Sequence, residues 1–218
     1  MPSSRRTSQL RGEKLSVKKS KRIPIMKVCL IGDGGVGKTA LRENYVGSSF
    51  TDSYLPTIGA EFATKTEIMD SYTGKFLIWD LAGQPRFSVV REGYYKGARG
   101  LLLVFDVTRT DSFESAPNWL SEAWKHVDQG RSIPIILIGN KIDIRDDESL
   151  RAKNERSLSE ATPMIATEQG HMLAREIDNL TPENAPPIEY YETSAKTGEN
   201  VEKAFQNLGK LILTQVRL

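Results

Sequence analysis

The sequence has a single cysteine, Cys29, and no long apolar run among its 218 residues. One cysteine excludes an intramolecular disulfide framework and fits a reducing compartment. The longest apolar runs, Leu101–Phe105 and Ile133–Ile138, are far shorter than the roughly 20 residues that cross a bilayer as a helix. The first 22 residues are charged rather than apolar, unlike a secretory signal peptide. We therefore expect a cytoplasmic protein without a transmembrane segment.

Charge is unevenly distributed along the chain. The formal net charge is +2, but residues 1–22 hold eight basic residues and one acidic residue, which leaves 22 basic and 27 acidic residues for the rest. We predict that this cationic arm is disordered in isolation, because its few apolar residues follow no helical or strand period. Three roles for the arm stay open: weak electrostatic contact with an anionic membrane, a tail that only increases solubility, and nucleic-acid binding, which we favour least.

Apolar runs alternate with helix-like segments after the arm. We predict strands over Ile25–Ile31, Glu61–Met69, Lys75–Leu81, Gly100–Asp106, Ile133–Gly139 and Glu189–Glu192. The expected helices are Lys38–Val46, Phe113–Gln129, Thr167–Ile177 and Asn200–Val216. Asp111 and Glu114 have the spacing of a capping box at the start of the second helix. This order predicts one α/β domain over residues 23–218, with a mostly parallel sheet flanked by helices on both faces.

A glycine-rich segment carries the strongest functional signal. Residues 32–39 fit the P-loop pattern G-x-x-x-x-G-K-[ST] without a mismatch, directly between a predicted strand and a predicted helix. Glycines let the backbone wrap closely around phosphates and aim its N–H groups at them. The Lys38 amine can reach the terminal phosphates, and the Thr39 hydroxyl can bind Mg²⁺. The segment predicts nucleotide contacts from Asp33, Gly34, Gly35, Val36, Gly37, Lys38, Thr39 and Ala40.

A second motif distinguishes guanine from adenine. Asn140, Lys141 and Asp143 directly follow a predicted buried strand, where ligands of open α/β sheets collect. A carboxylate there can accept two hydrogen bonds, from the guanine N1–H and from its 2-amino group, which adenine cannot offer. The stem of Lys141 can stack on the base. An N-K-x-D string alone is common and can form a solvated turn, but its place in the strand order favours GTP or GDP as the ligand.

With these two motifs the chain resembles a small GTPase of the Ras superfamily over residues 25–216, and the Rab subfamily most closely. Residues 58–62 are similar to the Rab element I-G-V-D-F, and residues 94–98 resemble another Rab element. The resemblance implies a three-layer P-loop G domain with six strands that switches between GTP and GDP, in membrane traffic or signalling. It implies slow intrinsic, Mg²⁺-dependent hydrolysis of GTP, a monomeric state, and effectors, an exchange factor and an activating protein that bind two switch segments.

The resemblance also assigns roles to residues of the two switches. Residues 79–84 are similar to the second switch motif, which implies that Asp80 holds Mg²⁺ through water, that the Gly83 amide senses the γ-phosphate, and that Gln84 orients the attacking water. Residues 56–59 match the first switch, where Thr57 contacts Mg²⁺ and the γ-phosphate. The implied catalytic residues are therefore Gln84, Lys38 and Thr57, and the implied metal ligands are Thr39, Thr57 and Asp80.

Further residues match positions that contact the base or the effectors in relatives. Phe50 falls where the family packs an aromatic ring on the guanine edge. The last guanine-contacting loop is matched by Ser194, Ala195 and Lys196, with the Ala195 amide facing the guanine oxygen. An apolar patch that senses the nucleotide state is implied for Phe62, Trp79 and an aromatic residue at the position of Phe87 or Tyr95. Simple core packing is the alternative role for these aromatic residues.

Three features depart from the family pattern. The sequence has no cysteine near Leu218, which predicts no prenylation, so a membrane role would depend on the arm or on a partner. Pro85 stands where Rab and Ras proteins usually have a glutamate that assists nucleotide exchange, and we expect exchange to proceed differently. Residues 145–162 form a charged insert at the position of the insert helix of Rho proteins, either to bind an effector or as a solvated appendage.

Two other functions compete with the switch. A nucleotide-binding scaffold that never hydrolyses GTP would have the same motifs. A P-loop kinase acting on a small metabolite would share residues 32–39, but it would prefer ATP, and residues 140–143 argue against that preference.

Overall fold

The computed structural model describes residues 23–47, 56–69, 72–127, 132–146, 164–183 and 185–215. These residues form a six-stranded sheet with the strand order β2-β3-β1-β4-β5-β6. The strands are β1 (Ile25–Ile31), β2 (Ala60–Met69), β3 (Tyr72–Leu81), β4 (Gly100–Asp106), β5 (Ile135–Asn140) and β6 (Glu189–Thr193). β2 pairs antiparallel with β3, and the other four pairs of neighbouring strands in the described sheet are parallel. The predicted mostly parallel sheet is confirmed.

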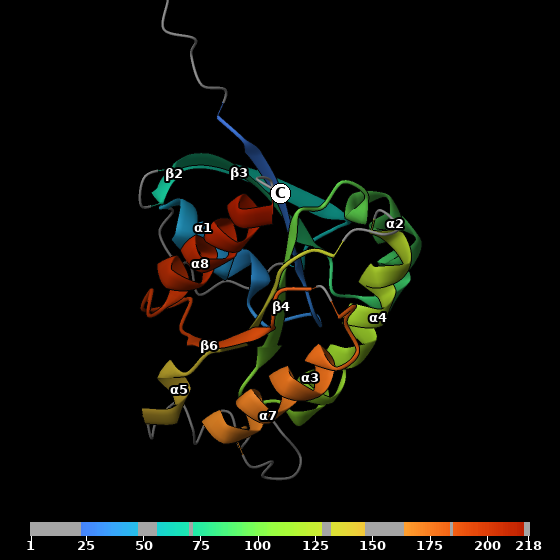
Figure 1. The fold of residues 1–218 in the computed structure, drawn as a ribbon. Helices are drawn as coiled ribbons and strands as arrows, with labels where there is room; N and C mark the ends of the chain where they lie inside the picture. The colour runs from blue at the N-terminus through green and yellow to red at the C-terminus, as the bar shows by residue number, and fades with distance from the viewer. Residues whose placement is uncertain are drawn as a thin grey trace, which may run out of the picture.

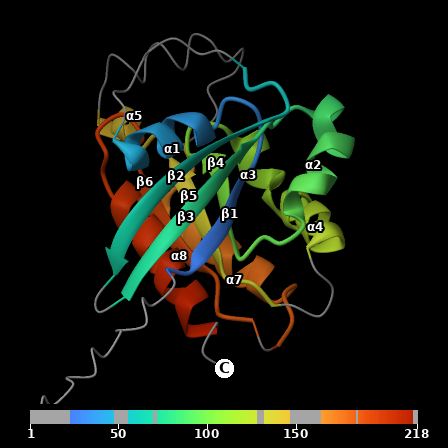
Figure 2. The ribbon, with the colours of Figure 1, turned by 90° about the horizontal axis from the view of Figure 1, so that it is seen from above.

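Helices cover both faces of the sheet (Figures 1 and 2). One face carries α1 (Lys38–Val46) and α8 (Val201–Gln215), and the other carries α2 (Ser88–Tyr95), α4 (Ala116–His126) and α7 (Thr167–Asp178). The shorter elements are a 3-10 turn, η1 (Pro85–Phe87), and the helices α3 (Thr110–Glu114) and α5 (Asp143–Asp146). Among the helices of the described ranges, none is long and apolar enough to cross a membrane.

The apolar core consists of two layers, one on each face of the sheet. Along β1, Val28 and Leu30 point to the layer that contains Phe205 of α8, whereas Cys29 and Ile31 point to the layer under α4 and α7. Since both faces are covered, the central strands are continuously apolar rather than alternating. Cys29 is fully buried, and burial raises the pKa of its thiol to about 12. It is a core residue, as predicted, with little thiolate at neutral pH.

The segment predicted as one helix over residues 113–129 forms two helices instead. α3 begins at Thr110, and Ser115 separates it from α4. Pro117 has no N–H to continue the hydrogen bonds of α3, so the chain starts a new helix with proline in its first turn. Asp111 consequently lies inside the first turn of α3, where its carboxylate accepts a hydrogen bond from the Ser112 N–H. The predicted capping box of Asp111 and Glu114 is wrong.

Several predicted boundaries also shift. β3 begins at Tyr72, three residues before the predicted start, because its hairpin partner β2 pairs with it up to Met69. β5 begins at Ile135, after Pro134, which cannot donate a hydrogen bond to a neighbouring strand. The cationic arm, Phe50 and most of the charged insert lie outside the described residues.

The topology brings five chain segments to one edge of the sheet. Parallel strands have their carboxyl ends at the same edge, so the segments that follow β1, β3, β4, β5 and β6 meet there. This edge holds the predicted P-loop, the second switch motif and the predicted guanine loops.

Candidate functional site

The segment that joins β1 to α1 has a backbone that requires glycine. Gly32 and Gly37 both have positive φ angles, of 134° and 97°. A Cβ atom on Gly32 would overlap the carbonyl oxygen of Val104, and one on Gly37 would overlap the side-chain nitrogen of Asn140. Both glycines are therefore needed for the loop to pass close to its neighbours. Val36 and Ala40 face the apolar layer beneath, which leaves the backbone of the loop to contact a ligand.

The amine of Lys38 lies across this loop. Its side chain is nearly buried, at 6% exposure, and Nζ donates hydrogen bonds to the carbonyl oxygens of Gly32 and Asp33, each at 2.7 Å. Burial lowers the pKa of Lys38 to about 8, although the negative charges of Asp80 and Asp33 act to raise it. A buried cation that two loop carbonyls hold across the loop is suited to bind a polyanion that enters it.

Three oxygen-bearing side chains from separate segments meet beside Lys38. The Thr39 hydroxyl donates a hydrogen bond to Asp80 Oδ2 at 2.5 Å and lies 3.1 Å from the Thr57 hydroxyl, which is 3.5 Å from the same carboxylate oxygen. Asp80 is fully buried, and its Oδ1 has no hydrogen-bond partner within the described part of the chain. Burial is the main cause that raises the pKa of Asp80. An unpaired buried carboxylate oxygen beside two hydroxyls fits the oxygen ligands of Mg²⁺.

The second switch motif packs directly against the P-loop. A Cβ atom on Gly83 would overlap the backbone of Asp33 and Gly34, so glycine is needed where these two loops meet. Gln84 follows in an extended conformation, half-buried, and Pro85 begins η1 immediately after it. The predicted catalytic glutamine therefore lies next to the loop that is predicted to bind phosphates.

The buried amide of Asn140 connects the P-loop to the loop after β6. Its nitrogen donates a hydrogen bond to the Val36 carbonyl at 2.9 Å. Its oxygen accepts hydrogen bonds from the Thr193 hydroxyl and the Ala195 N–H, both at 3.1 Å. Asn140 thus has a connecting position in addition to the role that its motif predicts.

Two charged side chains next to Asn140 have fixed partners. Asp143 Oδ1 accepts a hydrogen bond from the Ser194 hydroxyl at 2.6 Å. Lys141 has a positive φ of 72°, and its amine lies 2.6 Å from the buried carboxylate of Asp106 at the end of β4. Lys196, in the same loop as Ser194, is exposed. The predicted base-binding residues of the two loops therefore lie together. Phe50, the other residue predicted to contact the base, is outside the described residues.

Comparison with known proteins identifies the family. The sequence profile of the Ras family matches residues 27–214. The chain belongs to the Ras family. It is 39% identical to the Ras-related protein RABE1e of Arabidopsis thaliana over 186 residues, which cover 85% of this chain and 74% of that protein. It is also 39% identical to the GTP-binding protein YPT53 of Saccharomyces cerevisiae over 189 residues, which cover 86% and 76% of the two chains.

A third relative places the chain near the Rab proteins as well. The Ras-related protein Rab-13 of Canis lupus familiaris is 36% identical over 189 residues, which cover 87% of this chain and 80% of Rab-13. As a Rab-like member of the Ras family, the protein is a small GTP-binding switch and a GTPase. The resemblance to Rab-like GTPases of the Ras superfamily, predicted from the motifs, is confirmed.

The aromatic patch of this Ras-family chain contains a residue that the sequence did not single out. The Trp79 ring lies 5.3 Å from the Phe62 ring and 4.9 Å from the Tyr94 ring, measured between centroids. Tyr95, one of the two predicted candidates, is instead fully buried under α4. The other, Phe87, has its ring beside the Arg86 guanidinium. Successive residues of a helix differ by about 100° in direction, so Tyr94 reaches Trp79 while Tyr95 enters the core.

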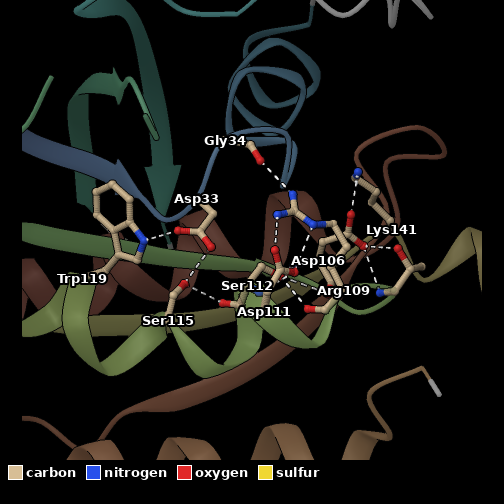
Figure 3. A network of polar contacts seen from close by, with 10 residues as sticks. Asp33, Gly34, Asp106, Arg109, Asp111, Ser112, Ser115, Trp119 and Lys141 are labelled. Carbon is tan, nitrogen blue, oxygen red and sulfur yellow. Dashed lines mark hydrogen bonds and ion pairs between the residues drawn. The ribbon is translucent and has the colours of Figure 1, made fainter. Parts of the chain in front are cut away.

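Side chains of α4 and of the N-cap residues of α3 and α4 contact the outer side of the P-loop, and no local sequence pattern predicted these contacts (Figure 3). The Asp33 carboxylate accepts hydrogen bonds from the Ser115 hydroxyl at 2.8 Å and from Trp119 Nε1 at 2.7 Å. The Arg109 guanidinium donates to the Gly34 carbonyl at 2.8 Å and pairs with Asp111. The P-loop of this Ras-family protein is thus tied to the helices after β4 as well as to Asn140.

The position of Asn140 leads to a test of nucleotide retention. Asn140→Asp keeps the acceptor for Thr193 and Ala195 but turns a carboxylate oxygen toward the Val36 carbonyl, where the amide nitrogen donates now. Because two acceptors repel each other, the P-loop should separate from the base loops, and GDP should dissociate about 100-fold faster. Release of a fluorescent GDP analogue measures this rate.

Asn179→Asp, at an exposed position after α7, is the matched control and should not change the GDP release rate. An Asn140→Asp variant that releases GDP at the same rate as the unmodified protein would contradict the connecting role of Asn140.

Proposed function

We propose that this protein binds GTP together with Mg²⁺, keeps its two switches ordered through Thr57 and Gly83, and releases them after hydrolysis. The observation that carries the proposal is the meeting of Thr39, Thr57 and Asp80 oxygens within 3.5 Å of one another. These side chains come from the P-loop, the segment before β2 and the end of β3. A ligand that joins these three segments can report its presence to both switches.

The phosphates would lie in the loop between β1 and α1. Its amides, from Gly34 to Thr39, run through the loop into the first residues of α1, which begins at Lys38 and whose helix dipole favours an anion. The Lys38 amine would exchange its two carbonyl partners for phosphate oxygens. This exchange would also favour the charged form of the amine, because a phosphate is a stronger partner for a cation than a carbonyl is.

The Mg²⁺ ligands would be the Thr39 and Thr57 hydroxyls, with the Asp80 carboxylate acting through water. The unpartnered Asp80 Oδ1 supports this assignment, since a buried carboxylate oxygen without a hydrogen bond fits a site completed by an ion and its water. When bound, Mg²⁺ neutralises charge on the β- and γ-phosphates. Thr57 would then lose a ligand contact when GTP becomes GDP, which frees the first switch.

The base would be recognised by the loops after β5 and β6. The Asp143 carboxylate would accept hydrogen bonds from the guanine N1–H and its 2-amino group, with Ser194 holding the carboxylate in orientation. Asn140 and Ala195 would complete the pocket, and the stem of Lys141 would stack on the base. A partner that accepts from both guanine donors rejects adenine, which offers neither.

Hydrolysis would depend on Gln84, which orients the attacking water, with Lys38 and Thr57 stabilising the phosphates. The intrinsic rate should be slow, and an arginine donated by an activating protein could raise it roughly 10³–10⁵-fold. Effectors, an exchange factor and the activating protein would bind a monomer at its switches. The exposed side chains of Phe62, Ile58 and Val89 support a partner surface there, next to the Trp79–Tyr94 pair.

Gln84→Leu tests the proposed mechanism. The substitution removes the groups that orient water but leaves the phosphate and guanine contacts in place, so GTP binding should be unchanged and single-turnover hydrolysis should slow at least about tenfold. Phosphate release from preloaded protein measures the rate, and Gln206→Leu in α8 is the control with wild-type hydrolysis. A Gln84→Leu variant with the wild-type rate of single-turnover hydrolysis would contradict the role given to Gln84.

We also propose that the cationic arm attaches the protein peripherally to anionic membranes. The net charge of +7 over residues 1–22 supports this role, since each basic residue near an anionic surface contributes on the order of 1 kcal/mol. The full chain should bind anionic vesicles at low salt and dissociate from them at high salt, because salt screens the attraction. A variant without residues 1–22 should not bind. Sedimentation with neutral vesicles is the control, and equal binding by the shortened variant would refute the proposal.

A further inference from the structure

An arginine lies buried beneath the second switch. Arg91 of α2 is 2% exposed, and its Nε and Nη2 donate to the two carboxylate oxygens of Glu122, each at 2.7 Å. Its remaining nitrogen, Nη1, donates to two backbone carbonyls, of Ala82 at 3.0 Å and of Gln84 at 2.9 Å. One guanidinium thus joins α4 to the backbone of the second switch.

The two carbonyls belong to Ala82 and Gln84, the residues before and after Gly83. In a trans peptide the C=O and the following N–H point in opposite directions. The Ala82 carbonyl points to Arg91, so the Gly83 N–H points away from Arg91. The Cα atom of Gly83 meanwhile lies against the backbone of Asp33 and Gly34. Rotation of the Gly83 peptide would break a hydrogen bond to Arg91, and so Arg91 fixes the direction in which the Gly83 amide and Gln84 face.

The support for Arg91 comes from α4, the helix that also supports the P-loop. The guanidinium lies 4.4 Å from the centre of the Trp119 ring, and Trp119 Nε1 donates to the Asp33 carboxylate. The Tyr95 hydroxyl donates to Glu122 Oε1 at 2.9 Å, which holds the carboxylate from α2. The P-loop and the second switch are therefore both positioned relative to one rigid helix face, formed by Trp119 and Glu122.

Both members of this ion pair stay charged at neutral pH. Burial alone would lower the pKa of Arg91, but the hydrogen bonds and charge of Glu122 outweigh it and raise that pKa. Burial would likewise raise the pKa of Glu122, and the bonds from Arg91 and Tyr95 lower it instead. The bidentate geometry matches the planar guanidinium, which a lysine cannot reproduce.

We propose that Arg91 is a positioning residue for GTP hydrolysis, which holds the Gly83 amide and Gln84 toward the nucleotide by binding the carbonyls on both sides of Gly83. The inference rests on the role proposed for Gln84. It adds the residue that keeps this glutamine in place and the helix from which that residue acts.

Arg91→Lys is the informative substitution. Lysine keeps a positive charge opposite Glu122, but one ammonium cannot bind both carboxylate oxygens and both carbonyls. Single-turnover hydrolysis of GTP should slow about tenfold, while GDP release stays within about twofold. The lost hydrogen bonds should lower the melting temperature, but the GDP-bound protein should stay folded at the assay temperature. Arg175→Lys, at an exposed position on α7, should hydrolyse GTP at the wild-type rate.

The same substitution in a Gln84→Leu background shows whether Arg91 acts through Gln84. If it does, Arg91→Lys should slow the residual hydrolysis of Gln84→Leu less than about twofold. A tenfold slowing in both backgrounds, or wild-type hydrolysis by Arg91→Lys alone, would overturn the inference and leave the role of Gln84 intact. Wild-type hydrolysis by Gln84→Leu alone would instead overturn the proposed function, and this inference with it.

Discussion

The candidate site depends on the hydrogen bonds of the buried Asn140 amide. In the proposed function a nucleotide is recognised at both ends, its phosphates by the loop after β1 and its base by the loops after β5 and β6. Those loops belong to three strands, and Asn140 binds all of them at once, through Val36, Thr193 and Ala195. The protein's own hydrogen bonds therefore set the spacing between the proposed phosphate and base sites, which lowers the cost of ordering on binding.

The second switch has a different support. Trp119 of α4 binds Asp33 of the P-loop, and Glu122 of α4 binds Arg91, which in turn binds the Ala82 carbonyl. The same helix therefore positions both the P-loop and the peptide before Gly83. The first switch has weaker protein contacts at Thr57, where the hydroxyl bonds are 3.1 and 3.5 Å long. In the proposed function, a nucleotide with its metal would add contacts to Thr57 of the first switch, whereas the peptide before Gly83 in the second switch is already held by Arg91.

Local motifs predicted most of the residues that the candidate site brings together, because glycine-rich phosphate loops and the N-K-x-D string carry their chemistry within a few residues. The sheet was predictable as well, since strands buried on both faces are continuously apolar. Contacts across long separations had no local signal: Trp119 meets Asp33 across 86 positions, and Arg91 meets Glu122 across 31. Tyr94 and Tyr95 could not be distinguished, because one residue of helix rotation decides which of them reaches Trp79.

Base selectivity tests the central claim, that this site is built for guanine nucleotides, most directly. Competition binding of GTP, ATP and xanthosine triphosphate to the wild type and to Asp143→Asn measures it. The wild type should prefer GTP, and Asp143→Asn should prefer xanthosine triphosphate by about 100-fold, because the asparagine amide donates to the 2-oxo group of xanthine. Equal binding of ATP and GTP by the wild type, or an unchanged preference in Asp143→Asn, would contradict the account.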